Sequence, residues 1–549
     1  MAKPEAPSER TVRHFRQILL WPLQLMPIHD EAQIQNHWEL LQQGGADNPW
    51  REIEDEFTSD PKEFQERHYN EFVAFLPYVQ RMLYGEGKGC GSAAGESPIR
   101  VFRRGDIRQA RLRYPDGESV VFDVAHVDLY FFYDLDVMVL AVEIFTNEIS
   151  FERAHETLFR FGRSYPTYWN HDGRGGHCLN EVEWLGTGGE VLAVSDYQKR
   201  EKYLASVCRH RAPGISSHWE FLLQPMVLHH SDQQGPIRYR LVEYHRMPVC
   251  GYLTLDDPRV LTRGDFMRLA LLTPPGPGNR LPLQESESSG FEQRCCHVRF
   301  WNAHDEGAPG SRALCNGETL MMVGPEHQHA YPGGGPDLKE LFRHQYFLMF
   351  LIPHLHKSAL FMLSDRLLQA LNRLVVGNPE STRAFKRNIR SLKEIFLRFS
   401  HRYWFHEISD QLQAKALYRM CREHLDTERL YCEVRDEIED MNKYLDSDSI
   451  RRQANMVIRL TVVTIFGLIG TVATGFLGMN LIAAADSPLW LRVVYFLLAF
   501  VPTIALTFYT ITKSKRLADF LDALSEEQLP LKAKFKALAM VWDKRDRGL

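Results

Sequence analysis

Oxygen-bearing side chains interrupt an apolar stretch near the C-terminus of this 549-residue sequence. The run LTVVTIFGLIGTVATGFLGMN, from Leu460 to Asn480, carries no charge, yet it contains Thr464 and Thr471 and ends in Asn480. Hydroxyl and amide oxygens are neutral acceptors, and they can bind the water shell of a divalent cation without stripping it. A helix that served only as a membrane anchor would need no such line of polar residues. The pattern therefore indicates a helix with a function beyond anchoring.

Two uncharged runs predict membrane-spanning helices. The first, 460–480, has 21 residues, and at 1.5 Å per residue it measures about 31 Å, enough to cross the hydrocarbon layer. The second, 493–512, has 20 residues and contains Pro502, which spanning helices tolerate. Because the connection 481–492 has only 12 residues, we expect an antiparallel hairpin.

The distribution of Lys and Arg orients this hairpin. Four such residues precede the first run, four follow the second, and Arg492 alone lies in the connection. Positive residues accumulate in cytoplasmic loops, so both termini, including the basic tail 513–549, are predicted to be cytoplasmic in a multi-pass inner-membrane protein. The N-terminal sequence has no apolar signal-peptide core, which agrees with this orientation.

The average composition, by contrast, is that of a soluble protein. A mean hydropathy of -0.32 and 44% apolar residues exclude disordered and collagen-like chains. A net charge of -5 gives no basic excess that would favour nucleic acid. Nine scattered cysteines favour a reducing compartment. The apolar run 346–352 is too short to span a membrane and is predicted to be buried.

The region before the hairpin divides into three predicted parts. Residues 1–97 are expected to be an N-terminal extension, mixed helical to about residue 85, with the Gly/Ser-rich linker 85–97. Residues 98–336 are expected to be a cytosolic α/β domain, with α+β as the alternative, and with loop insertions of little order at 273–290 and 331–337. Residues 337–459 are expected to form a helical stalk region. Strands are predicted in 99–104, 110–124, 127–134, 136–145, 237–246 and 297–302.

Local signals predict where two of the helices begin. Ser150 can cap a helix over 151–163. In the stalk region, Asn378 and Pro379 are expected to stop one helix, and Ser381 or Thr382 is expected to start the next.

One long helix is predicted to join the stalk region to the first span. Between Asp426 and Met479, no proline or glycine occurs before Gly467, so a helix of some 54 residues can form. Apolar residues recur along it mostly at steps of three and four, as in a self-associating helix. The cytosolic half of this helix is acidic, with carboxylates at Asp426, Glu428, Glu433, Asp436, Glu437, Glu439, Asp440, Asp446 and Asp448.

The triplet Gly478-Met479-Asn480 closes the first predicted span and resembles the Gly-Met-Asn signature of the CorA-type magnesium transporter family. Its setting is also similar to that family over about 425–520: a stalk helix, the signature, a short outer loop, a second span and a basic tail. The resemblance implies a CorA-like homopentamer in which the first spans line a pore, 460–480, and the second spans face lipid. Gly478, Met479 and Asn480 would then form the selectivity mouth. Positions that match the pore lining are Gly475, Thr471, Leu468, Thr464, Leu460 and Val457.

The same resemblance implies a transport function and not an enzyme activity. We expect Mg²⁺, and also Co²⁺ or Ni²⁺, to pass into the cytosol, with Mg²⁺ as substrate and regulatory ligand and with no other cofactor. Mg²⁺ bound between neighbouring cytosolic domains would hold the pore shut. Its ligands are expected among the stalk carboxylates, with Asp436, Glu437 and Asp440 as candidates, or at Asp134 and Asp136. Like-charged stalks repel one another unless cations bridge them.

Alternatives remain open at this stage. A ZntB-like zinc transporter shares the architecture, and Asp486 is the single charge in the segment LIAAADSPLW. A membrane-anchored cytosolic sensor or scaffold without transport would also use a hairpin. The threonines can instead bond their own helix carbonyls, and the stalk acids can be a solvated face paired with Lys and Arg. The abundant histidines match no structural zinc spacing, and no enzyme motif occurs.

Overall fold

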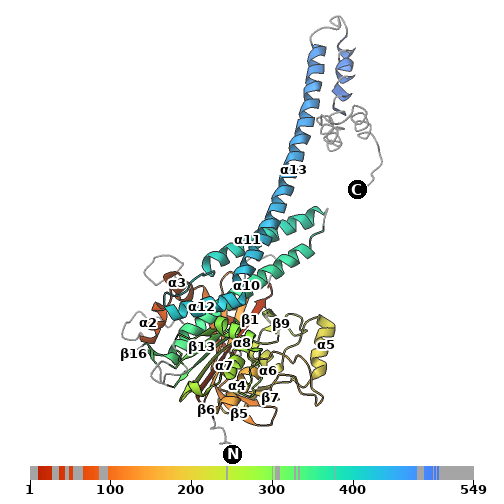
Figure 1. Ribbon diagram of the computed structural model, residues 1–549. Helices are drawn as coiled ribbons and strands as arrows, with labels where there is room; N and C mark the ends of the chain where they lie inside the picture. Colours follow the sequence, from red (N-terminus) through yellow and green to blue (C-terminus); the bar gives the residue numbers. More distant parts are fainter. Residues whose placement is uncertain are drawn as a thin grey trace, which may run out of the picture. The chain divides into compact units, whose positions relative to one another are not determined.

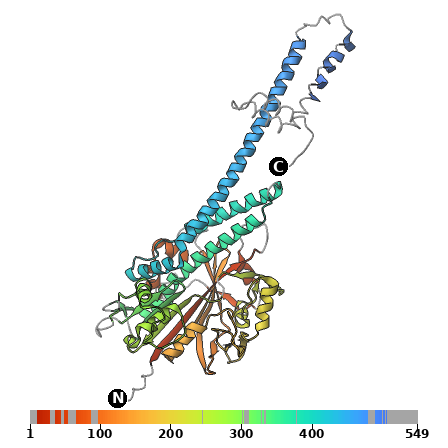
Figure 2. The same ribbon diagram turned by 45° about the vertical axis from the view of Figure 1, so that its right-hand side comes forward.

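The computed structural model describes most of the chain, in two units. The described residues are 10–27, 36–43, 48–53, 66–85, 97–242, 245–299, 301–302, 310–326, 329–331, 334–375, 378–478, 488–491, 493–498, 500–502 and 504–505. The first unit comprises Met1–Ile438 and the second Glu439–Leu549. The coloured ribbons of Figure 1 and Figure 2 follow the described residues.

A large mixed β-sheet forms the centre of the first unit. It has 14 strands in the described residues, and its main path runs β12-β13-β14-β11-β1-β6-β5-β4-β7-β8. The pairs β11–β14 and β9–β10 are parallel, and the other described pairs in this sheet are antiparallel. The sheet is therefore closer to the α+β alternative than to a series of parallel βαβ units. The strands are β1 Thr11–Leu25, β2 Trp50–Glu52, β3 Ile99–Arg104, β4 Gln109–Arg113, β5 Ser119–Phe132, β6 Val137–Ser150, β7 Glu181–Leu185, β8 Val191–Val194, β9 Val227–Leu228, β10 Arg238–Leu241, β11 Val249–Leu255, β12 Cys296–His297, β13 Arg312–Cys315 and β14 Thr319–Pro325, with β15 His329–Tyr331 and β16 Gly334–Asp337 forming a separate pair.

The N-terminal strand β1 corrects the prediction of a mixed-helical extension. It pairs with β6 along almost its whole length, and on its other side with β11 and then with β10. Pro22 lies between the stretches that pair with β11 and β10, a position where its missing N–H costs no ladder bond. Residues 11–25 are thus an interior strand of the sheet and not an appended segment.

Helices cover both faces of the sheet (Figure 1). The helices and helical turns of the described residues are α1 His37–Gln42, α2 Glu66–Val73, α3 Pro77–Tyr84, α4 Phe151–Arg160, α5 Arg200–His210, α6 Ser217–Leu223, η1 Pro258–Val260, α7 Arg263–Leu271, α8 Glu285–Cys295, α9 Leu338–Leu341, η2 Phe342–Tyr346, α10 Phe347–Asn372, α11 Pro379–Arg402, α12 Leu412–Leu425 and α13 Thr427–Gly478. Leu19 of β1 lies against Gly162, directly after α4. Gln24, of opposite parity in the strand, donates to Asp365 of α10. Because successive side chains point to opposite faces, α4 and α10 cover opposite sides of the sheet.

Several local predictions are confirmed. Strands occur at 99–104, at 119–132 and at 137–150, and the last two are central in the sheet. The hydroxyl of Ser150 accepts from the backbone N–H of Arg153 and caps α4. The predicted strand at 297–302 is wrong except for His297 in β12. Residues 285–290 belong to α8, so the expectation of a loop through 273–290 is wrong for its last part.

The apolar run 346–352 belongs to a buried helix, as predicted. Within the described residues, Leu338–Asn372 is the one helical stretch long and apolar enough to cross a membrane, and 78% of its most apolar window is buried inside the protein. Pro353 lies inside α10. The break before α11 is confirmed, but its cap is Asn378, whose side chain accepts from the N–H groups of Glu380 and Ser381. The expected cap at Ser381 or Thr382 is therefore wrong.

The predicted long helix is confirmed. Helix α13 runs 52 residues without interruption, a length of about 78 Å at 1.5 Å per residue. Phe396 and Ser400 of α11 contact Tyr431 of α13 through a ring contact and a hydrogen bond. Beyond residue 488, the described residues include the apolar helical stretch Leu489–Pro502.

Candidate functional site

The predicted pore-lining positions form an exposed line along α13. Val457, Leu460 and Leu468 are 62%, 67% and 64% exposed in the single chain. A Cβ added at Gly475 or Gly478 would meet no atom within 4 Å. The line as a whole comprises Val457, Leu460, Thr464, Leu468, Thr471, Gly475 and Gly478, all exposed. An apolar face of this size on one helix needs a partner, either lipid or further copies of the helix.

The two threonines of this line each make a hydrogen bond to their own helix. The Thr464 hydroxyl donates to the Leu460 carbonyl at 2.8 Å, and the Thr471 hydroxyl donates to the Gly467 carbonyl at 2.9 Å. This is the local bonding that sequence reasoning weighed against a pore role. The two roles are compatible, because a hydroxyl that donates its proton to a carbonyl keeps acceptor lone pairs directed away from the helix.

Part of the candidate site lies outside the described residues. These calls concern Met479 and Asn480, the outer-loop residues 481–487, the tail 513–549 and much of the second predicted span. Gly478 is the last residue of α13. The selectivity mouth therefore stays a sequence prediction.

The stalk carboxylates divide into paired and unpaired groups. Asp436 pairs with Arg435, and Asp440 pairs with Lys443. Glu437, Glu439 and Asp446 are exposed, and none of the three has an ion pair with a residue that the structure describes. Carboxylates without a cationic partner are free to bind a cation from solution or from another chain. Of the predicted regulatory ligands on α13, Glu437 fits a metal best.

Asp134 and Asp136 are neutralised within the chain. Asp134 accepts from Arg398 at 3.1 Å and from Arg402 at 2.7 Å, both in α11. Asp136 is buried and contacts Arg366 of α10. These salt bridges tie the β5–β6 turn to the helical layer. Metal binding at either aspartate would have to break them, which weighs against this pair as a regulatory site.

A buried charge cluster joins the sheet to the start of α10, and sequence reasoning missed it. Glu143 of β6 contacts Arg16 of β1 and accepts from Arg343 of η2 at 3.2 Å. Burial opposes ionisation of Glu143, but Arg16 and Arg343 outweigh it and hold its pKa below the usual range. His126 lies within 3.4 Å of Arg343. The signal was available, since Glu143 is the one charge in the apolar run 137–145, and a buried carboxylate needs a cation.

The histidine-rich segments have structural partners. His354 shares a hydrogen bond with the Gly317 carbonyl and His356 with the Tyr403 carbonyl, and both side chains are fully buried. Among the described residues, no group of three or more His, Cys, Asp or Glu side chains is placed to hold a metal ion. For His354 and His356, the interpretation as core residues is confirmed.

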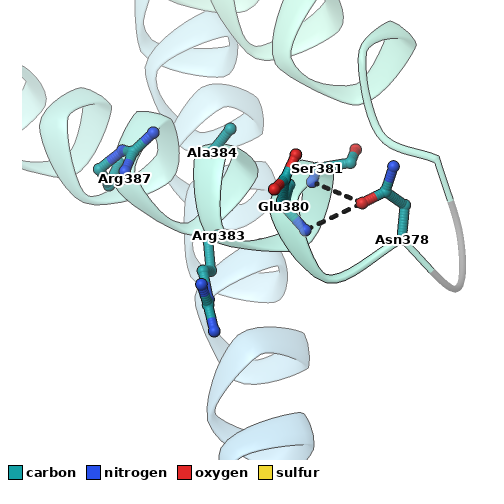
Figure 3. Close-up of a pocket in the computed structure, with 6 residues that line it drawn as sticks. All are labelled: Asn378, Glu380, Ser381, Arg383, Ala384 and Arg387. Carbon is teal, nitrogen blue, oxygen red and sulfur yellow. Dashed lines mark hydrogen bonds between the residues drawn. The ribbon is translucent and has the colours of Figure 1, made fainter.

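Helix α11 carries a basic surface that sequence reasoning also missed. Arg383, Arg387, Arg390 and Lys393 are exposed and Lys386 is half-buried. A shallow hollow at its first turn is lined by Asn378, Glu380, Ser381, Arg383, Ala384 and Arg387. In Figure 3, Arg383 and Arg387 extend away from Glu380 and from the capped turn. The cations therefore face outward and do not converge on a small-molecule site. The signal for this surface was five Lys and Arg residues between 383 and 393.

Comparisons with known proteins give no further assignment. No family model matches the chain, no curated protein matches it, and no solved structure matches it.

Proposed function

We propose that this protein is a homopentameric divalent-cation channel of the CorA type. It passes Mg²⁺, and also Co²⁺ or Ni²⁺, down the electrochemical gradient into the cytosol. The chain crosses the inner membrane twice, at 460–480 and 493–512, with both termini in the cytoplasm. Membrane lipid, divalent cations and further copies of the chain are its partners.

One observation carries this proposal. The helix α13 continues without a break from a segment rich in carboxylates into an uncharged segment whose threonines and leucines are exposed along one line. In a ring of identical helices, such a line would be covered by its own copies and would enclose a path. Gly478-Met479-Asn480 follows at the end of this line.

The polar positions would conduct the cation with its water shell. Mg²⁺ dehydrates reluctantly, so a pore that offers acceptors to the bound water lowers the barrier more than one that demands dehydration. Rings of Asn480, Thr471 and Thr464 oxygens supply such acceptors. Each threonine has already given its proton to the helix backbone, which leaves its oxygen as an acceptor toward the path.

The apolar positions would form the gate. Leu468, Leu460 and Val457 alternate with the threonines along the same line. When apolar side chains from several copies approach one another, water leaves the constriction and ions cannot pass. A small outward movement of the helices re-wets it.

The acidic segment would sense the transported ion. Glu437, Glu439 and Asp446 have no cation partner among the residues described for a single chain, so parallel copies would repel there. Mg²⁺ bound at these oxygens would neutralise the charge and hold the copies in the closed arrangement. Loss of the ion would let them separate.

The test is ion flux from purified protein in liposomes, together with particle symmetry by electron microscopy with and without Mg²⁺. We expect fivefold particles and Mg²⁺ uptake that a fluorescent indicator reports. Zn²⁺ uptake without Mg²⁺ uptake would identify a zinc transporter instead. Monomeric particles without flux would overturn the proposal in favour of an anchored sensor or scaffold.

A further inference from the structure

Two helices of the chain carry opposite and equal charge. Helix α11, Pro379–Arg402, has seven Lys and Arg against two Glu, a net charge of +5. The segment 427–450 of α13 has eight Asp and Glu against three Lys and Arg, a net charge of -5. Fields of this kind direct association between surfaces of opposite sign.

The cations of α11 share one side of the helix. Phe385, Ile389 and Leu392 are buried on the opposite side. At 100° per residue, the five cations fall within roughly a third of the helix circumference. We call them the basic face of α11: Arg383, Lys386, Arg387, Arg390 and Lys393. This helix therefore holds its apolar side in the protein and its basic face outward.

The basic face has no counter-charge in the described part of its own chain. Arg398 and Arg402, nearer the C-terminus of α11, pair with Asp134, but none of the five residues of the basic face has an ion pair with a described residue. The carboxylates Glu437, Glu439 and Asp446 of α13 are unpaired in the same sense. Val434 and Ile438 are buried, and these acids lie on other sides of the helix. We call Glu437, Glu439 and Asp446 the acidic face of α13.

We propose that the basic face of α11 docks on the acidic face of α13 in a neighbouring copy of this chain. This inference rests on the proposed oligomeric function and names the contact that assembles it. The contact joins two different surfaces, so it repeats head to tail and closes into a ring, as a cyclic oligomer requires. It also brings cations to the acidic segments, whose mutual repulsion would otherwise oppose the assembly.

The contact is electrostatic, and its strength should follow from that. Individual exposed ion pairs contribute little, so several must act together in each interface. Screening shortens the range of exposed charges to about 8 Å at physiological ionic strength and to about 3 Å at 1 M salt. The oligomer should therefore loosen in high salt.

Charge reversal tests the pairing in the full-length protein, reconstituted in nanodiscs or held in detergent. The variants are R387E/R390E, E437K/E439K and the combination of the four substitutions. We expect each double variant to dissociate at a protein concentration about tenfold higher than the parent, as measured by native mass spectrometry. The combined variant should return toward the parent, because both charges are exchanged. Arg209→Glu, at an exposed cation on α5, is the control for added negative charge and should leave assembly unchanged.

The outcomes separate this inference from the channel proposal. If the parent is pentameric and conducts Mg²⁺ but R387E/R390E assembles normally, the docking inference is wrong and the channel proposal stands. If the combined variant fails to recover while both double variants dissociate, the two faces do not pair with each other, and the inference is again overturned. If R387E/R390E assembles normally and loses only a dependence on anionic lipid in the nanodisc, the basic face binds membrane instead. A parent protein without flux would overturn the channel proposal alone.

Discussion

Thr464 and Thr471 lie two turns apart on one exposed face of α13, and each hydroxyl donates to the carbonyl four residues earlier, at 2.8 and 2.9 Å. The bond fixes each side chain in one orientation and uses its only proton. The oxygen that remains exposed acts as an acceptor. A hydrated cation presents water protons, so this arrangement suits cations and offers no proton to an anion.

The first prediction follows from this geometry. Thr471→Val keeps the shape of the side chain but replaces the oxygen with a methyl group, and we expect Mg²⁺ flux in liposomes to fall at least about fivefold. Thr471→Ser keeps the oxygen and should retain most of the flux. Equal flux in the valine and serine variants would show that the hydroxyl serves only the helix.

The second prediction concerns the signature residue Asn480. Cobalt(III) hexaammine imitates a cation whose shell cannot exchange, so it should block a mouth that recognises bound water. We expect Asn480→Ala to weaken this block about tenfold and to lower the preference for Mg²⁺ over Ca²⁺. Asn480→Gln, which retains an amide, should lose less. Unchanged flux and unchanged block in the alanine variant would contradict the assignment of the mouth.

The third prediction tests the buried cluster of the first unit. Glu143→Gln leaves Arg16 and Arg343 without their carboxylate, and we expect the free energy of unfolding to fall by about 3–5 kcal/mol. Glu423→Gln removes one partner of the exposed Arg419–Glu423 pair and should cost at most about 0.5 kcal/mol. Chemical denaturation followed by tryptophan fluorescence measures both. Similar losses in the two variants would show that the cluster does not tie β6 to η2.

How far the sequence predicts this protein depends on how local the signal is. The long helix α13 follows from the absence of proline and glycine before Gly467, and the cap at Ser150 follows from three neighbouring residues. Both depend on short-range chemistry. The strand β1 was missed because its polar residues are satisfied by distant ones: Arg16 contacts Glu143, and Gln24 donates to Asp365. Polar residues with remote partners do not show the alternation of a strand with one face in water.

The candidate site was predictable for a related reason. A membrane-facing segment shows its periodicity directly, because it must carry its polar atoms on a helix. Thr464 and Thr471 therefore stand out in the sequence. The docking faces were not predicted, since a run of cations such as Arg383–Lys393 resembles any solvated helix until its ion pairs are known. The ligands of a regulatory metal between copies have no local signature at all.

The fourth prediction concerns the acid sensitivity of the first unit. Burial lowers the pKa of His354 and His356 to about 3, against about 6.5 in an unfolded chain. Both rings are neutral in the fold, so protons bind the unfolded chain first. Their contribution to stability is complete above pH 6.5 and declines as the pH falls toward 3. Each histidine then costs about 2 kcal/mol between pH 6.5 and 5. His356→Gln keeps a donor for the Tyr403 carbonyl but does not titrate, so the slope of unfolding free energy against pH should fall by about 1.4 kcal/mol per pH unit near pH 5. The exposed His171→Gln is the control, and an unchanged slope in the His356 variant would show that this ring is not buried in its neutral form.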